Sequence, residues 1–313
     1  MSRRALVPIG ITLLILALAA GCRIGALGSL ERSAPMPSAP ASPLAAMHGR
    51  SFYPLDLGNR WHYVRTFSST WVDELGTPQE FNVTSALERE LRCETALGAR
   101  SYMAERTLEV APNGTYLSWV YYRQDRNGLY EADDPTPPPC DSPPPPEETG
   151  PGLHAVALSS IAEPGRLPED PAARAAMVTL EQRLALVRYT LGLPAPSMHR
   201  PRPAAGEIVR LAYPLHTGQR WVIRAQPRFT STVEGVDVLR LPAGRFVAHR
   251  IRINSELFGP NDRVRVWYGR EGFLQLDAHL ESQGVDPYGN VYPVQSDDRE
   301  RLDGIDLIDG GLD

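Results

Sequence analysis

Apolar and polar residues alternate along the chain between residues 236 and 280. Apolar residues, with His249 as the one exception, occupy every second position over 247–253, 264–268 and 274–280, and glycine- or proline-containing turns separate these runs. A period of two that is interrupted by turn residues predicts antiparallel strands with one apolar and one polar face. We therefore expect a β-meander in this part of the chain.

The turn at residues 259–262 predicts how its two flanking strands pair. Gly259-Pro260-Asn261-Asp262 is a strong turn signal. If the apolar faces of both strands align, Ile253 lies opposite Val264 and Ile251 lies opposite Val266. A slip by one residue would turn these side chains to the wrong face, so we expect this register.

The same register brings basic residues together on the polar face of these strands. This possible anion patch consists of Arg250, Arg252, Arg263, Arg265 and Trp267. Arg252 would lie opposite Arg265, and like charges in that position destabilise a sheet by up to about 1 kcal/mol. Either Asp277 on the next strand compensates the charge, or an external anion such as a lipid phosphate or an acidic partner binds. The internal pairing is the simpler expectation, because exposed charges are usually solvated.

Residues 51–134 carry a similar strand pattern around Pro112-Asn113-Gly114. A two-residue turn of Asn113 and Gly114 would pair Val110 with Leu117 and Leu108 with Trp119. One face of this hairpin would then be aliphatic and aromatic, which is typical of a core face.

A nine-residue stretch occurs twice in the chain. Tyr53-Pro54-Leu55-Asp56-Leu57-Gly58-Asn59-Arg60-Trp61 and Tyr213-Pro214-Leu215-His216-Thr217-Gly218-Gln219-Arg220-Trp221 are identical at six positions. We interpret this as an internal duplication, with Trp61 and Trp221 as equivalent core anchors. Weaker matches, Thr84-Ser85 with Thr230-Ser231 and Tyr122 with Tyr268, extend it. They place an insertion in the first copy, as a long hairpin around 67–81.

One helix is predicted, over about residues 171–191. Asp170 is a good N-cap, Pro171 suits the first helical position, and Gly192 follows the last turn. Apolar residues form one stripe at spacings of three and four: Met177, Leu180, Leu184, Val187 and Leu191. A helix that covers a sheet is the favoured interpretation, and a short dimerising coiled coil is the alternative.

The fold class that follows is mostly β, with two duplicated antiparallel curved-sheet domains and a proline-rich, helical connector. The expected segments are a signal peptide at 1–21, a lipidated Cys22 with a flexible tether to residue 50, the first repeat at 51–134, the connector at 135–207, the second repeat at 208–283 and an acidic tail at 284–313.

The first 22 residues have the pattern of a secretory signal. Arg3 and Arg4 precede an apolar run to Ala20 that is shorter than the roughly 20 residues needed to span a membrane. Leu18-Ala19-Ala20-Gly21-Cys22 resembles the lipobox of bacterial lipoproteins, although Ala19 stands where leucine is usual. The resemblance implies acylation of Cys22 and cleavage before it. Arg23 differs from the aspartate that retains such proteins in the inner membrane, which implies the outer membrane, facing the periplasm.

Charge and cysteine content narrow the function classes. The chain has 32 basic and 37 acidic residues, which argues against general nucleic-acid binding. Cys93 and Cys140 are the remaining cysteines after Cys22, and export to an oxidising compartment favours a disulfide between them over two free thiols. No motif for catalysis, nucleotide binding or metal binding is present, and no cofactor is expected.

The repeated Tyr-Pro-Leu-x-x-Gly-x-x-Trp stretch, together with Leu241-Pro242-Ala243-Gly244-Arg245-Phe246, resembles uncharacterised bacterial envelope lipoproteins. The resemblance implies curved sheets, such as half-barrels similar to lipoprotein carriers, and no catalytic residue. We expect a lipid-anchored, non-catalytic envelope protein that binds an apolar ligand or an envelope partner. A hydrolase whose site is assembled from scattered residues, and a purely structural spacer, are the alternatives.

A buried core position is expected for His249, which lies on an apolar strand face.

Overall fold

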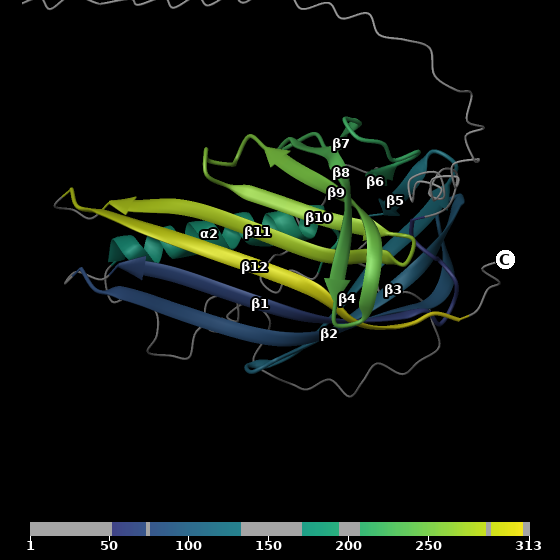
Figure 1. Cartoon of the computed structure of the whole chain (residues 1–313), viewed down its shortest axis with the longest axis horizontal. Helices are drawn as coiled ribbons and strands as arrows, with labels where there is room; N and C mark the ends of the chain where they lie inside the picture. The colour runs from purple at the N-terminus through teal and green to yellow at the C-terminus, as the bar shows by residue number, and fades with distance from the viewer. Residues whose placement is uncertain (1–51, 73–75, 133–170, 194–206, 286–288, 309–313) are drawn as a thin grey trace, which may run out of the picture. The chain divides into compact units, whose positions relative to one another are not determined.

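The computed structural model describes residues 52–72, 76–132, 171–193, 207–285 and 289–308. This part of the chain is mostly β with a single helix (Figure 1). Its elements are β1 (Arg60–Val72), β2 (Pro78–Leu97), β3 (Arg100–Ala111), β4 (Gly114–Asp125), β5 (Gly128–Ala132), α2 (Pro171–Thr190), β6 (Glu207–Ala212), β7 (Arg220–Arg224), β8 (Phe229–Leu241), β9 (Gly244–Ser255), β10 (Arg263–Gly269), β11 (Gly272–Val285) and β12 (Val291–Asp306).

All strands belong to one antiparallel sheet of 12 strands. Its order is β6-β5-β4-β3-β2-β1-β12-β11-β10-β9-β8-β7, so each half is a meander and the two halves join where β1 pairs with β12. The sheet curls until its edge strands β6 and β7 lie near each other. Side chains bridge this seam: Trp221 Nε1 donates to the Val209 carbonyl at 3.2 Å, and Gln219 Nε2 to the Ala212 carbonyl at 2.9 Å.

The expectation of two domains with separate cores is therefore not met. One cluster of buried apolar side chains extends through both repeats and includes Trp61 of the first and Phe229 of the second. The segment expected to be an acidic tail also differs, because residues 291–306 form β12, a central strand. A six-stranded meander has two unpaired edges, and pairing β1 with β12 removes one edge from each half.

The glycine turns of the two nine-residue copies take the same local conformation, although the Tyr213–Pro214 peptide bond is cis and the Tyr53–Pro54 bond is not. Gly58 and Gly218 both have a φ of 87°, which favours glycine. Their N–H groups donate at 2.8 Å to the Leu91 carbonyl of β2 and the Val233 carbonyl of β8, respectively. The Thr84-Ser85 match is not kept, because Trp61 lies opposite Arg89 whereas Trp221 lies opposite Ser231.

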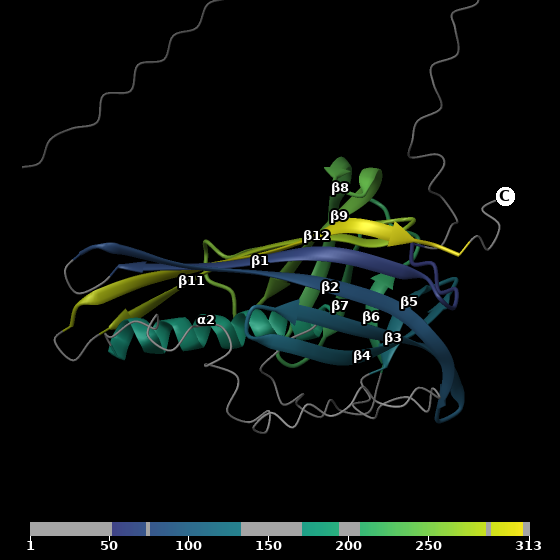
Figure 2. The same ribbon diagram turned by 90° about the horizontal axis from the view of Figure 1, so that it is seen from below.

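The long hairpin expected around 67–81 is present. In the first copy β1 has 13 residues, whereas its counterpart β7 has 5. The extra length of β1 pairs with β12 as far as Trp71, opposite Val294. The extended part of the sheet formed in this way is the surface on which α2 lies (Figure 2).

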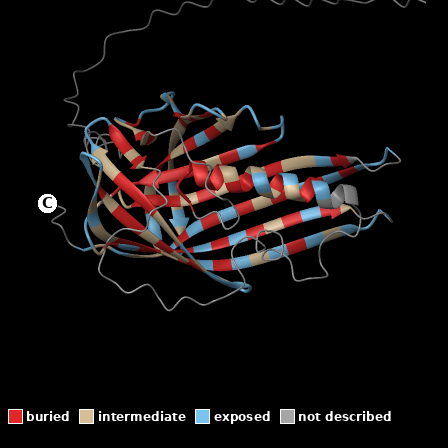
Figure 3. Cartoon of the chain, turned by 180° about the vertical axis from the view of Figure 1, so that it is seen from behind, coloured by how far each residue is buried: buried red, intermediate tan, exposed pale blue. Residues whose placement is uncertain are grey.

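The predicted helix is confirmed as α2, and it covers a sheet. Gly192 follows it with a φ of 66°, and the Leu193 N–H donates back to the Arg188 carbonyl at 2.9 Å, which closes the last turn. The whole predicted stripe from Met177 to Leu191 is buried against the inner face of the sheet (Figure 3). We call the face under α2 the inner face and the opposite face the outer face.

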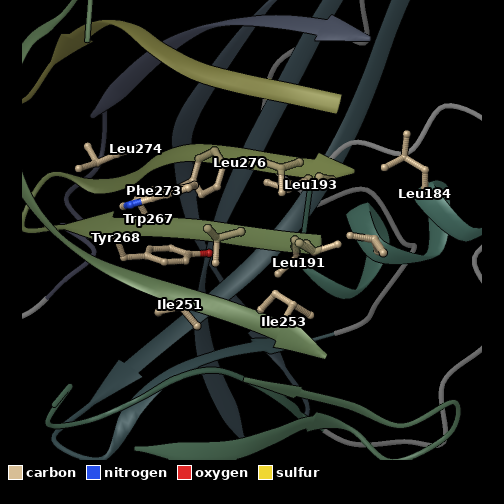
Figure 4. Close-up of a cluster of buried hydrophobic side chains, with 14 of the residues drawn as sticks. Leu184, Leu191, Leu193, Ile251, Ile253, Trp267, Tyr268, Phe273, Leu274 and Leu276 are labelled. Atoms are coloured by element: carbon tan, nitrogen blue, oxygen red, sulfur yellow. The ribbon is translucent and has the colours of Figure 1, made fainter. Parts of the chain in front are cut away.

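Aliphatic and aromatic side chains pack between the end of α2 and the inner face of β9–β11. Figure 4 shows Leu191 near Ile253 of β9 and Leu193 near Leu276 of β11, with Leu184 farther along α2. Burying a side chain of this size stabilises the fold by about 1.5–3 kcal/mol, so the helix is an integral part of the core.

Several expectations concern residues outside the described part. These are the signal peptide, Cys22 with its tether, the proline-rich start of the connector and Cys140. Among the described residues, no helix has the length and apolarity that a membrane-spanning helix requires.

Candidate functional site

The predicted register of β9 and β10 is confirmed. Ile253 lies opposite Val264, Ile251 opposite Val266, and Arg252 opposite Arg265. Trp267 lies opposite Arg250, as expected. Because the apolar partners are buried on the inner face, the arginines lie on the outer face.

An internal carboxylate does compensate this cluster, but it is Glu234 rather than Asp277. Glu234 Oε2 accepts from Arg265 Nε at 2.8 Å and from Arg250 Nε at 3.1 Å. Asp277 lies opposite Arg265 as predicted, yet its ion pair is with Arg299, at 3.3 Å. The link between Arg250 and Trp267 is a shared carboxylate, Asp237, which both side chains contact.

A β-bulge lies on β8 beside the arginine cluster. The register of β8 against β9 shifts between Val233 and Gly235, so Glu234 is an extra residue on that strand. Alternation along β8 up to the buried Val233 already places Glu234 on the outer face. Bulges re-aim side chains, and beyond this bulge Asp237 contacts Arg250 and Trp267 on the same face.

An open depression of about 460 Å³ lies beside the cluster on the outer face. Its lining comes from β9, the 259–262 turn, β10 and β11: Arg252, Pro260, Asn261, Asp262, Arg263, Arg265, His279 and Glu281. This volume is within the range of about 300–1,000 Å³ that is typical of small-ligand sites. The sequence prediction identified three of these residues, Arg252, Arg263 and Arg265.

Protein donors occupy the carboxylates that line the depression. Asp262 is buried, accepts from the N–H groups of Gly259 and Glu281 at 2.7 Å each, and pairs with Arg183 of α2. Glu281 accepts from Asn261 Nδ2 at 2.7 Å and contacts His279 Nε2 at 3.2 Å. These hydrogen bonds hold the pKa of Glu281 below its usual value.

Two arginines of the depression form no ion pair with a described residue. Within the described ranges, neither Arg252 nor Arg263 has a carboxylate within ion-pair distance, and both are exposed. Arg250 and Arg265 of the same cluster are paired. The depression therefore contains two guanidinium groups that can donate hydrogen bonds to a ligand. The carboxylates beside them, Asp262 and Glu281, already accept hydrogen bonds from the protein.

The hairpin of β3 and β4 differs from its prediction in register and in face. Leu108 lies opposite Leu117 and Val110 opposite Thr115, so the pairing is shifted by two residues. The turn residues are Pro112 and Asn113, because Ala111 pairs with Gly114. The face expected to be the core is the outer one, and Val110 is 51% exposed.

Apolar residues consequently form a patch on the outer face of β1–β4. Val64 lies opposite Ala86, and Ala86 lies opposite Val110. Leu108 and Leu117 follow on the next row of β3 and β4. Val64, Val110 and Leu117 are 37%, 51% and 45% exposed. We call these five residues the outer apolar patch.

The inner face of β3 carries polar residues instead, namely Glu105, Thr107 and Glu109. Glu109 Oε1 accepts from Arg65 Nη1 at 3.0 Å and from Ser85 Oγ at 2.7 Å. Glu105 accepts from the Tyr53 hydroxyl at 2.5 Å. Burial raises the pKa of Glu105 by more than the charge of Arg89 lowers it.

A buried ionic network connects α2 to β12. Arg188 donates to Asp298 at 2.9 Å and to Glu300 at 2.8 Å. Arg65 of β1 also binds Asp298, and Arg89 of β2 also binds Glu300. Sequence reasoning missed these residues, although Asp298 and Glu300 fall on the same alternating positions as the apolar residues of β12.

Two residues singled out in the sequence, His249 and Cys93, lie on strands β9 and β2. His249 is buried, as expected, with its ring edge-on to Phe52 at a centroid distance of 5.1 Å. The described part of the chain contains no group of three or more His, Cys, Asp or Glu that could hold a metal ion. Cys93 lies on β2, and its bridge to Cys140 stays a prediction because Cys140 lies outside the described residues.

No protein-family model and no curated protein matches the chain. Among solved structures, it is similar to a candidate lipoprotein of Parabacteroides distasonis, with 12% identity, a TM-score of 0.32, and coverage of 82% of this chain and 98% of the other. A candidate exported protein with a YmcC-like fold from Bacteroides fragilis has 11% identity and a TM-score of 0.31, and the match covers 82% of this chain and 99% of the other. A β-barrel-like protein of a domain of unknown function from Brucella abortus has 8% identity, a TM-score of 0.21 and coverage of 81% and 99%. Similarity this low carries no inference about function.

Proposed function

We propose that this protein is a lipid-anchored, non-catalytic protein of the bacterial envelope that binds an envelope partner through the outer face of its sheet. The lipobox-like stretch that ends at Cys22 supports the anchor. The helix α2 covers the inner face of β11, β12 and β1, which leaves the outer face of these strands available to a partner.

The outer apolar patch is the observation that carries this proposal. Single exposed apolar residues are normal, but adjacent ones on several strands are a feature of interaction sites. Val64, Ala86 and Val110 form one row across β1–β3, and Leu108 and Leu117 form the next. Burying these side chains against a partner would remove apolar surface from water, which favours association.

An apolar ligand on the inner face is a weaker alternative. In the described residues α2 covers the inner face of β11, β12 and β1, and its stripe from Met177 to Leu191 is buried there. A ligand at this position would have to displace the helix, together with the buried pairing of Arg188 with Asp298 and Glu300.

The hydrolase alternative has one observation in its favour. His279 lines the outer depression and contacts two carboxylates, Asp297 at 3.0 Å from Nδ1 and Glu281 at 3.2 Å from Nε2. A general base needs one ring nitrogen within hydrogen-bond reach of the substrate. Because both nitrogens of His279 face carboxylates, we rank catalysis below binding.

Replacing Cys22 with serine should release the protein from the membrane. Each buried CH2 of an acyl chain contributes roughly 0.8 kcal/mol, so loss of the acylation site removes the anchor. Fractionation of cells that express Cys22→Ser measures this, with Cys93→Ser as the matched cysteine control. Membrane association of Cys22→Ser at the wild-type level would contradict lipidation at this residue.

Replacing Val110 with lysine should abolish partner binding without unfolding the protein. An exposed position tolerates lysine within about 0.5 kcal/mol, whereas a buried charge at an apolar interface is costly. Val238→Lys on β8 is the matched control, because Val238 is 49% exposed and lies outside the outer apolar patch.

The measurement is photo-crosslinking in cells from a probe at position 117, in the wild-type, Val110→Lys and Val238→Lys backgrounds. We expect one dominant adduct that disappears only with Val110→Lys. Equal adduct yields in all three backgrounds would show that the outer apolar patch is not the partner site.

A further inference from the structure

We propose that the depression on the outer face of β9–β11 is a binding site for a phosphoryl group, with Arg252 and Arg263 as its ligating residues. This inference is separate from partner binding by the outer apolar patch, because the two sites lie on different strands. It rests on the placement of the two guanidinium groups, on the engagement of the neighbouring carboxylates and on the available volume.

The first step is the position of the two arginines. Arg252 of β9 lies opposite Arg265 of β10, and Arg263 is two residues from Arg265 on the same face of that strand. Arg252 and Arg263 are therefore diagonal neighbours, about 7–8 Å apart along the sheet, and long side chains at this spacing can reach one common group.

The second step is that both arginines have free donor capacity. Glu234 already binds Arg265 and Arg250, and it forms no ion pair with Arg252 or Arg263. The two carboxylates that line the depression, Asp262 and Glu281, accept from protein donors. An anion that enters the depression consequently finds guanidinium donors and no free carboxylate acceptors among the described lining residues.

The third step concerns the class of anion. One guanidinium fork can satisfy both oxygens of a carboxylate. Two guanidinium groups on adjacent strands that line one depression offer two forks, and a tetrahedral phosphoryl group has enough oxygens to accept from both. Arginine is also the preferred residue for bidentate phosphate recognition. The site therefore fits a phosphoryl group better than a single carboxylate.

General electrostatic attraction does not account for such binding. The chain has a formal net charge of −5, so the molecule as a whole repels anions. A second cross-strand arginine pair, Arg240 opposite Arg245 at the β8–β9 hairpin, is also exposed but does not line the depression. This pair provides a control that matches the number and type of the charges removed and their position on two adjacent strands.

The test uses the full chain carrying Cys22→Ser, so that acyl chains do not contribute to membrane binding. Isothermal titration calorimetry measures binding of inorganic phosphate and of glycerol phosphate. Flotation measures binding to phosphatidylcholine vesicles with and without phosphatidylglycerol. Each assay is repeated with Arg252→Ser/Arg263→Ser and with Arg240→Ser/Arg245→Ser, and the melting temperature of each variant confirms folding.

We expect Arg252→Ser/Arg263→Ser to weaken binding by about 10- to 100-fold, because each hydrogen bond to a charged group contributes that factor or more. Arg240→Ser/Arg245→Ser should bind like the parent. Binding confined to phosphatidylglycerol vesicles would identify a lipid headgroup as the source, and binding of the soluble phosphates would identify a free phosphate. Equal losses in both double variants, or no binding to any of the probes, would overturn the proposal.

Discussion

Replacing Arg188 with alanine is expected to lower the free energy of unfolding by about 3–5 kcal/mol, because it removes one of the two arginine partners from each of two buried carboxylates, Asp298 and Glu300. The Arg188 side chain is 1% exposed, and those of Asp298 and Glu300 are fully buried. Breaking a buried ion pair from one side costs far more than the pair itself contributes. Urea denaturation, followed by far-UV circular dichroism, measures the change.

Two control variants distinguish the stability that the ionic network contributes from the effect of removing any arginine. Arg188→Lys keeps the charge but loses the planar fork that reaches both carboxylates, so an intermediate loss is expected. Arg301→Ala, at an exposed position of the same β12, should change stability by about 0.5 kcal/mol or less. A loss for Arg188→Ala no larger than that for Arg301→Ala would contradict a stabilising role for the network.

The network also determines the sign of the acid dependence. Burial alone would raise the pKa of Asp298, but the charges of Arg65 and Arg188 outweigh burial and hold this pKa below the usual value of 3.8. The unfolded state therefore binds the proton more readily, so the contribution of Asp298 is present above pH 3.8 and is lost as the pH falls through the folded-state pKa. Urea denaturation repeated at several pH values measures this loss. The free energy of unfolding should depend less on pH in Arg188→Ala than in the wild type.

Replacing Trp61 with alanine should cost about 3–5 kcal/mol, because a fully buried indole leaves a large cavity. Trp61 is completely buried, and its Nε1 donates at 2.6 Å to the Glu271 carbonyl in the β10–β11 turn. This hydrogen bond connects the first half of the sheet to the second. Trp221→Ala should cost less, because Trp221 is only partly buried.

Both tryptophan variants should lower one common transition in differential scanning calorimetry. The expectation of separate domains would give two transitions, each affected by its own tryptophan. One sheet with one core predicts cooperative unfolding of both halves instead. Two resolved transitions, with Trp61→Ala shifting only one of them, would show that the halves unfold independently.

Turn residues and apolar spacing correctly predicted the elements whose geometry depends on residues close in the sequence. Proline, glycine and apolar spacing placed the helix at 171–191, and α2 extends from Pro171 to Thr190. The 259–262 turn set the register of β9 and β10, because the apolar residues of both strands must share one face. The arginine cluster followed from that register alone.

The hairpin of β3 and β4 shows where such signals fail. Its apolar residues Val110 and Leu117 point outward, while Glu105 and Glu109 point inward. The inner acids are tolerated because Arg65 and Tyr53, from distant parts of the chain, bind them there. Hydrophobic alternation assumes that charged residues face water, and buried partners reverse that assumption.

The sequence by itself determined the strand-rich character, the helix, the repeated glycine turn and the grouping of arginines on one strand face. Only the tertiary structure decided that the two repeats share one sheet, that residues 291–306 form its central strand, and that Glu234 rather than Asp277 compensates Arg265. The physical reason is the sequence separation over which each kind of interaction acts. Turns and periodicity act over a few residues, whereas the pairing of Arg60 with Asp306 and the ionic contacts of Arg188 join residues more than 100 positions apart.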